Sequence, residues 1–82
     1  MIHLEYSEVY AKTKDIIVDY LGVDENEVEA ETDIVEELCV DSIALVELGF
    51  RFSETFGIPM VENNMDLYVM KNLVDFIYDS IE

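Results

Sequence analysis

The sequence predicts a small all-α protein, a four-helix bundle of three main helices and one short helix. Apolar residues, 51% of the 82-residue chain, recur at helical spacing in three segments. The first two of these segments are each followed by a glycine, a residue that commonly ends helices. The apolar content also argues against disorder, and at this length we expect one domain over residues 1–82.

The first predicted helix covers residues 7–21. Gly22 can adopt the left-handed conformation that ends a helix. The apolar positions that define the buried face are Val9, Ile16, Ile17, Tyr20 and Leu21.

An acidic connection follows over residues 24–37, with eight carboxylates and no basic residue. Repulsion between these charges disfavours a long helix. The pairs Asp24 with Glu27 and Asp33 with Glu36 have capping-box spacing and predict short turns. The residues expected to anchor the connection in the core are Val28, Ile34, Val35 and Leu38.

The second main helix is predicted to begin at Asp41 or Ser42 and to end at Phe56, before Gly57 and Pro59. It carries two stripes. The core-facing stripe comprises Leu45, Leu48, Gly49, Phe52 and Phe56. The other mixes apolar and acidic side chains and comprises Ile43, Glu47, Phe50 and Glu54.

Residues 57–64 are expected to form a loop, followed by a short helical turn over 66–69 and a last amphipathic helix over 71–81. No convincing strand pairs are found. The inward anchors of the loop are expected to be Ile58, Met60 and Val61, and the apolar face of the last helix comprises Leu73, Val74, Ile77, Tyr78 and Ile81.

The charge of −16 excludes several partners. Four basic residues against twenty acidic ones repel nucleic acid and anionic membranes, whereas basic patches on other proteins are attracted. No segment approaches the roughly 20 apolar residues of a membrane span, and no leader is evident, so we expect a cytoplasmic protein without membrane insertion. Cys39, the single cysteine, cannot form an internal disulfide and is expected to be a small apolar filler.

Hydrolase and calcium sites are also disfavoured. The only histidine is His3, and no Gly-x-Ser-x-Gly turn is present, so a serine triad has no base. The acidic connection fails as a calcium loop because Val28 and Val35 occupy ligand positions when counted from Asp24. No metal site is expected.

Residues 32–48 read Thr-Asp-Ile-Val-Glu-Glu-Leu-Cys-Val-Asp-Ser-Ile-Ala-Leu-Val-Glu-Leu. This run resembles the acyl carrier protein family, whose motif is Asp-Ser-Leu followed by a Val-Glu-Leu helix. Asp41-Ser42-Ile43 matches the motif, and Phe56-Gly57-Ile58 lies at the family's spacing. Residues 21–23 and the last helix also fit, so the resemblance covers nearly the whole chain. Its strength comes from the agreement of the motif, the helix ends and the order of the helices.

The resemblance implies a non-catalytic carrier. In this family a phosphopantetheinyl transferase moves phosphopantetheine from coenzyme A to the serine, and the arm's thiol then holds acyl groups as thioesters. Ser42 is the implied attachment residue, with Asp41 as its motif neighbour. A helix N-terminus suits such a site because its free N–H groups and dipole stabilise a phosphodiester.

The same resemblance implies a partner surface and an acyl pocket. Acyl-transferring and chain-modifying enzymes with basic patches are expected to dock on a monomeric carrier through Ile43, Glu47, Phe50 and Glu54. The pocket for the acyl chain is expected to be lined by Ile34, Val35, Val46, Phe52, Met60 and Leu73.

Several positions depart from the family pattern. Cys39 stands where many relatives have glycine, and Arg51 adds a positive charge to a helix that is usually more acidic. Further departures are Val40, Ile43, Ala44, Ser53 and residues 69–72. Fatty-acid, polyketide and other specialised pathways all stay open, and a peptidyl carrier is disfavoured by the acidity. The alternative is an acidic helical interaction module in which Ser42 is only a helix cap.

Overall fold

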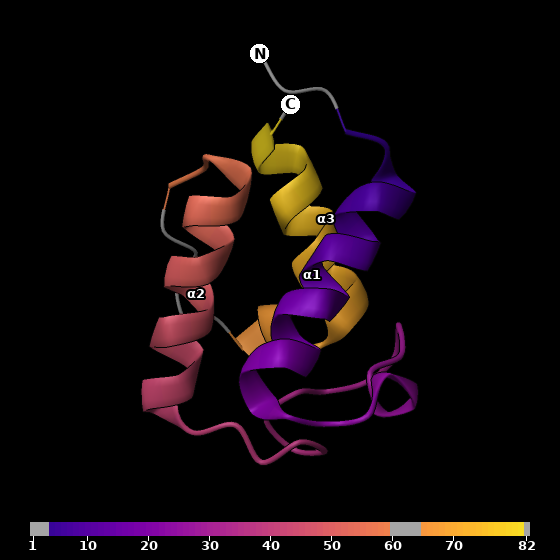
Figure 1. Cartoon of the computed structure of the whole chain (residues 1–82), viewed down its shortest axis with the longest axis vertical. Helices are drawn as coiled ribbons and strands as arrows, with labels where there is room; N and C mark the ends of the chain where they lie inside the picture. The colour runs from indigo at the N-terminus through magenta and orange to yellow at the C-terminus, as the bar shows by residue number, and fades with distance from the viewer. Residues whose placement is uncertain (1–3, 60–64, 82) are drawn as a thin grey trace.

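A computed structural model describes residues 4–59 and 65–81. It contains three α-helices, α1 (Tyr6–Leu21), α2 (Ser42–Phe56) and α3 (Met70–Ile81), and two 3₁₀ helices, η1 (Glu25–Glu27) and η2 (Met65–Tyr68) (Figure 1). The predicted all-α bundle is therefore confirmed. The short helical part is divided between two 3₁₀ turns, one inside the acidic connection and one before α3.

The ends of α1 and α2 follow from two glycines. Gly22 and Gly57 have φ angles of 70° and 66°, in the left-handed region that glycine enters without strain. Their N–H groups donate to the carbonyl oxygens of Val18 and Ser53. Both predicted helix stops are confirmed.

The three helices pack around one apolar core, in which α1 contacts both α2 and α3. α1 runs antiparallel to the other two, so its C-terminal end and the start of α2 lie at the same end of the bundle (Figure 1). The core residues are Val9, Ile17, Val28, Ile34, Val40, Leu48, Phe52, Phe56, Ile58, Met70, Leu73, Val74 and Ile77. Met60 and Val61, two of the expected loop anchors, lie outside the described residues.

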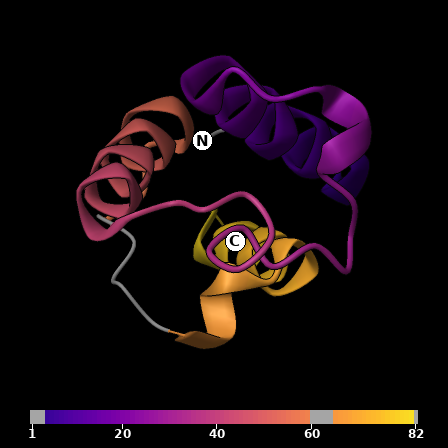
Figure 2. The same cartoon turned by 90° about the horizontal axis from the view of Figure 1, so that it is seen from below.

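The acidic connection crosses one end of the bundle and runs beside the start of α3 (Figure 2). Backbone hydrogen bonds join the two segments: Ile34 N–H donates to Tyr68 O, Met70 N–H to Thr32 O, and Lys71 N–H to Ala30 O, at 2.9, 2.8 and 2.9 Å. An isolated antiparallel bridge pairs Asp33 with Val69. The connection thus satisfies its backbone through another segment of the chain.

Two aspartates organise the turns within this connection. Asp24 and Glu27 form the predicted capping box at η1. The Asp33 carboxylate accepts the N–H groups of Val35 and Glu36, so the turn predicted from the Asp33 and Glu36 spacing is confirmed. The Asp33 N–H donates to the Glu37 carboxylate at 2.8 Å, so Glu37 takes the place that a capping box gives to Glu36. The turn is one residue longer than a capping box, since the Glu37 N–H bonds to the Asp33 carbonyl.

An aromatic contact fastens the start of α1 to α3. The Tyr6 hydroxyl donates to Asp75 at 2.6 Å, and the ring meets Tyr78 edge to face at 5.5 Å between centroids. The hydrogen bond to Asp75 is the main cause that raises the pKa of Tyr6 to about 12, with desolvation and the Asp75 charge adding to it.

Candidate functional site

The chain makes a strained turn just before α2. Cys39 has a φ of 56°, which is left-handed backbone at a residue other than glycine. Val40 is buried and its N–H reaches the Ile34 carbonyl at 3.4 Å, which holds the turn against the core. The Cys39 side chain is exposed, so the expectation of an apolar filler is wrong. Its conformation explains why glycine suits this position.

Asp41 caps α2. Its carboxylate accepts the Ala44 N–H at 2.8 Å, and its own backbone is extended. Ser42 is consequently the first helical residue and not the cap, which contradicts the reading of this serine as a simple helix cap. The Ser42 side chain is exposed and forms no hydrogen bond with any residue that the structure describes.

An apolar stripe continues from Ser42 along the outer face of α2. Ile43, Val46 and Phe50 are 78%, 56% and 43% exposed and lie three and four residues apart, on one side of the helix. Val46 was expected to line the acyl pocket, and its exposure places it on the outside instead. The spacing from Ile43 and to Phe50 was the signal in the sequence that could have placed it.

Two acidic residues are expected on the partner surface, and they differ in their ion pairing: Glu47 has a basic partner among the described residues, and Glu54 has none. The Glu47 carboxylate pairs with Arg51 on the next turn at 3.5 Å, in a half-exposed ion pair. The Arg51 guanidinium also lies over the Tyr20 ring, 4.8 Å from its centroid, which ties α2 to α1. Arg51 therefore neutralises one of the two acids on α2, which leaves Glu54 as the unpaired carboxylate of that stripe.

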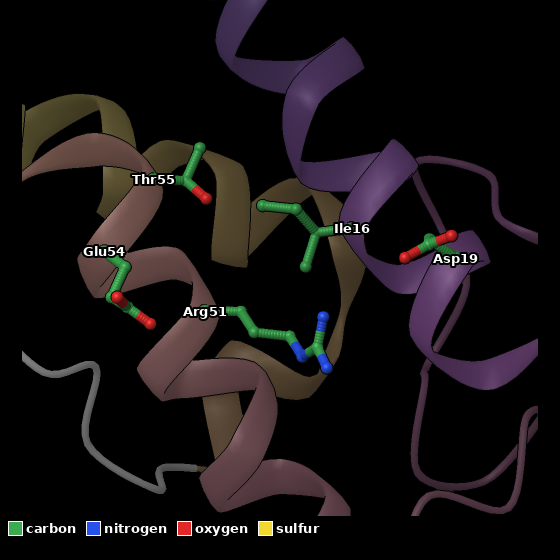
Figure 3. Close-up of a pocket in the computed structure, with 5 residues that line it drawn as sticks. All are labelled: Ile16, Asp19, Arg51, Glu54 and Thr55. Carbon is green, nitrogen blue, oxygen red and sulfur yellow. The ribbon is translucent and has the colours of Figure 1, made fainter.

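A groove of about 310 Å³ lies between α1 and α2 (Figure 3). Ile16 from α1 and Arg51 from α2 point toward one another across it. The lining residues are Ile16, Asp19, Arg51, Glu54 and Thr55. The groove is separate from the expected acyl pocket, none of whose residues line it.

Three residues expected at the acyl pocket are buried together. Ile34, Phe52 and Leu73 are 2%, 2% and 3% exposed and belong to the same core cluster, although they come from the connection, α2 and α3. Val35 is half-buried and packs against this cluster. Met60 lies outside the described residues.

The negative charge is concentrated on the connection and not on α2. Residues 24–37 hold eight acidic residues, and this segment lies at the end of the bundle where α2 begins (Figure 1). Helix α2 itself has two acidic residues and one basic residue, Arg51. Most of the long-range attraction for a basic partner would therefore come from the connection and not from α2.

Neither a metal site nor a membrane helix is found in the part of the chain that the structure describes. Within residues 4–59 and 65–81, no group of three or more histidine, cysteine, aspartate or glutamate side chains could hold a metal ion. Within the same residues, no helix is long and apolar enough to cross a membrane.

The start of α2 fits a phosphodiester-linked group. Ser42 offers an exposed hydroxyl at the N-terminus of a 15-residue helix, whose dipole favours a negative charge at that end. The capping function is already supplied by Asp41, so modification of the serine removes no described hydrogen bond.

Comparison with known proteins places the chain in a family. The family model "Phosphopantetheine attachment site" matches residues 11–77. The chain is 32% identical to an acyl carrier protein of Petrotoga mobilis over 75 residues, covering 90% of this chain and 88% of the relative. It is 32% identical to one of Thermotoga maritima over 71 residues, covering 85% and 88%, and 38% identical to one of Clostridium acetobutylicum over 58 residues, covering 71% and 75%.

These matches define a protein that carries a covalently attached phosphopantetheine group. The chain belongs to the acyl carrier protein family. Members of such a family interact with a phosphopantetheinyl transferase and with acyl-handling enzymes.

The cap at Asp41 can be tested separately from its charge. We expect Asp41→Ala to lower the free energy of unfolding by about 1 kcal/mol, because the Ala44 N–H loses its partner. Asp41→Asn keeps an acceptor and should stay close to the wild type. Chemical denaturation measures both, and equal losses in the two variants would show that the charge, and not the hydrogen bond, stabilises α2.

The strained turn gives a second prediction. Cys39→Gly should raise the free energy of unfolding by up to about 1 kcal/mol, because glycine relieves the left-handed backbone despite its greater freedom when unfolded. Cys39→Ala removes the thiol and keeps the β-carbon, so it should bring no gain. Urea denaturation of the three proteins compares them, and a gain in the alanine variant would assign the effect to the thiol.

Proposed function

We propose that this protein carries acyl groups as thioesters on a phosphopantetheine arm attached to the Ser42 hydroxyl. The observation that carries the proposal is the exposed, unpaired Ser42 hydroxyl at the start of α2, next to a separate cap residue. The match to the phosphopantetheine attachment family supports it. The pathway stays open among fatty-acid, polyketide and other specialised acyl assembly.

Attachment requires an external enzyme, because no residue among 4–59 and 65–81 forms a hydrogen bond with the Ser42 hydroxyl that could activate it. Its neighbour Asp41 is engaged as the helix cap, and the single histidine of the chain is His3, far from Ser42 in the sequence. In the transfer, the serine oxygen forms a bond to phosphorus as the pyrophosphate bond of coenzyme A breaks. The transferase takes the serine proton, and adenosine 3′,5′-bisphosphate leaves.

The chain's own role after loading is placement and recognition, and no catalysis. The arm supplies the thiol that holds the acyl group. The helix dipole of α2 stabilises the phosphodiester charge at Ser42, and the acidic connection attracts enzymes with basic surfaces.

Partner enzymes are proposed to dock on the exposed face of α2. Ile43, Val46 and Phe50 present an apolar strip that leads away from Ser42. Glu54 offers a charge at the far end of the helix, whereas the charge of Glu47 is partly offset by Arg51. Apolar anchors of this kind hold transient complexes in which charges set the rate of encounter.

The acyl chain itself is proposed to enter the core between α2 and α3. Ile34, Phe52 and Leu73 supply apolar walls from three different segments, and Val35 lies at their edge. These side chains pack against one another, so a guest must move them apart.

Arm attachment can be measured directly. On incubation with coenzyme A, magnesium and a broad-specificity phosphopantetheinyl transferase, the intact mass should rise by one phosphopantetheinyl group, and Ser42→Ala should abolish the increase. Ser7→Ala is the matched control, because Ser7 is also an exposed serine in the first turn of a helix. An arm on the Ser42→Ala protein, or none on the wild type with several transferases, would overturn the assignment.

The docking strip gives a comparison between two exposed phenylalanines. Phe50→Ala should lower kcat/KM for arm transfer by about tenfold, the effect of truncating one interface anchor. Phe76→Ala on α3 is the control, because Phe76 is 40% exposed against 43% for Phe50. Both variants should keep wild-type stability. Equal kinetics in the two variants would contradict docking through α2 for this enzyme.

A further inference from the structure

Thr13 is a buried polar residue without a partner. It lies near the middle of α1, is fully buried, and its hydroxyl oxygen makes no hydrogen bond with the described residues. One turn away on either side, Val9 and Ile17 are also fully buried, so Thr13 occupies a position on the core face of the helix. Valine has nearly the same shape and would fill this position without the cost of an unpaired hydroxyl.

Thr32 shows how this fold treats a buried threonine that has a structural role. It is the other buried polar side chain of the described core. Its hydroxyl accepts the Glu29 N–H at 2.9 Å and donates to the Glu27 carbonyl at 3.3 Å, which holds the turn together. Thr13 has no such bonds, and its hydroxyl does not bond the carbonyl of Val9 one turn earlier, which is the usual partner of a threonine inside a helix.

A single water is a poor partner for Thr13. Buried waters generally need two to four polar neighbours. The neighbouring positions on the helix face, Val9 and Ile17, are apolar, and the hydroxyl of Thr32 is already engaged. An oxygen atom on an acyl chain needs only one hydrogen bond, to the Thr13 hydroxyl, because the rest of the chain is apolar.

We infer that the acyl chain of this carrier bears an oxygen substituent, a hydroxyl or carbonyl, which pairs with the Thr13 hydroxyl inside the bundle. This inference rests on the proposed function, since the guest is the acyl chain that enters the core. Helix α1 contacts both α2 and α3, the two helices that contribute Phe52 and Leu73 to the expected pocket. Val9 and Ile17, the buried residues one turn to either side of Thr13, belong to the same core cluster as Phe52 and Leu73, so Thr13 lies on the face of α1 that borders this core.

Thr13 lies well inside the bundle, measured from the end where α2 begins. Eight residues separate Thr13 from Leu21, or about 12 Å of helix. Leu21 is at the end of the bundle where Ser42 begins α2 (Figure 1). The arm and the acyl chain together can cover this depth, so the carbon that bears the oxygen is identified by the series of substituted chains tested below.

The test is a comparison of loaded proteins. The arm is attached with a transferase from acyl-coenzyme A compounds that carry either a plain twelve-carbon chain or the same chain with a hydroxyl or keto group at successive positions, where the chain length is about that of the helix span above. Thermal unfolding is measured for the wild type, Thr13→Val and Thr13→Ser. In the wild type, the chain whose oxygen reaches Thr13 should raise Tm by about 5 °C more than the plain chain.

The variants isolate the hydroxyl. In Thr13→Val the protein loaded with the oxygenated chain should have a lower Tm than the protein loaded with the plain chain, because the oxygen is then buried without a partner. Thr13→Ser should restore the wild-type order. Thr55→Val is the control, because Thr55 is an exposed threonine on α2 and its replacement should leave the order unchanged. Without an acyl chain, Thr13→Val should be at least as stable as the wild type.

Two failures can be told apart. If intact mass shows that no arm attaches at Ser42, the proposed function fails, and this inference fails with it. If the arm attaches but plain and oxygenated chains rank alike in the wild type and Thr13→Val, or no chain changes Tm, the inference is overturned and the carrier function stands.

Discussion

The attachment of the acidic connection to the start of α3 is the constraint on which the functional end of the molecule depends. The connection cannot become a helix of its own, because its eight carboxylates repel one another. Its backbone is instead satisfied by three hydrogen bonds to residues 68–71 and by the bridge between Asp33 and Val69. With this segment fixed, Ile34 can hold Val40 in place, and α2 must begin two residues later.

Dense negative charge and exposed apolar side chains therefore lie on different segments of the molecule. The dense negative charge lies on the connection, while the outer face of α2 carries the exposed apolar side chains Ile43, Val46 and Phe50. Long-range attraction and close contact are thus provided by neighbouring segments. Arg51 strengthens this separation, because it neutralises Glu47 and binds Tyr20, so that α2 is held to α1 by its only basic residue.

Two residues are poorly suited to their local structure, and both lie where the carrier function would act. Cys39 holds a backbone conformation that favours glycine, three residues before Ser42. Thr13 holds an unpaired hydroxyl in the core. Local choices that oppose stability tend to mark functional positions. In this protein Cys39 lies next to the proposed attachment site of the arm, and Thr13 lies in the core that the acyl chain is proposed to enter.

The sequence by itself determined the helices and the position of Ser42. Periodic apolar residues gave the helix faces, Gly22 and Gly57 fixed two helix ends, and Asp41 marked the start of α2, since these signals act within a few residues of chain. Burial on the core stripe of α2 was predictable for the same reason. The family motif around Ser42 could also be read locally.

Tertiary structure decided the features that depend on segments far apart in sequence. The Glu37 contact at Asp33, the left-handed backbone of Cys39 and the pairing of the connection with α3 follow from how the helices and the connection pack. The unpaired hydroxyl of Thr13 belongs with them. The sequence shows only that Thr13 lies within a helix, where its hydroxyl could bond water or a backbone carbonyl. The packing of the three helices buries the hydroxyl oxygen and excludes water from it.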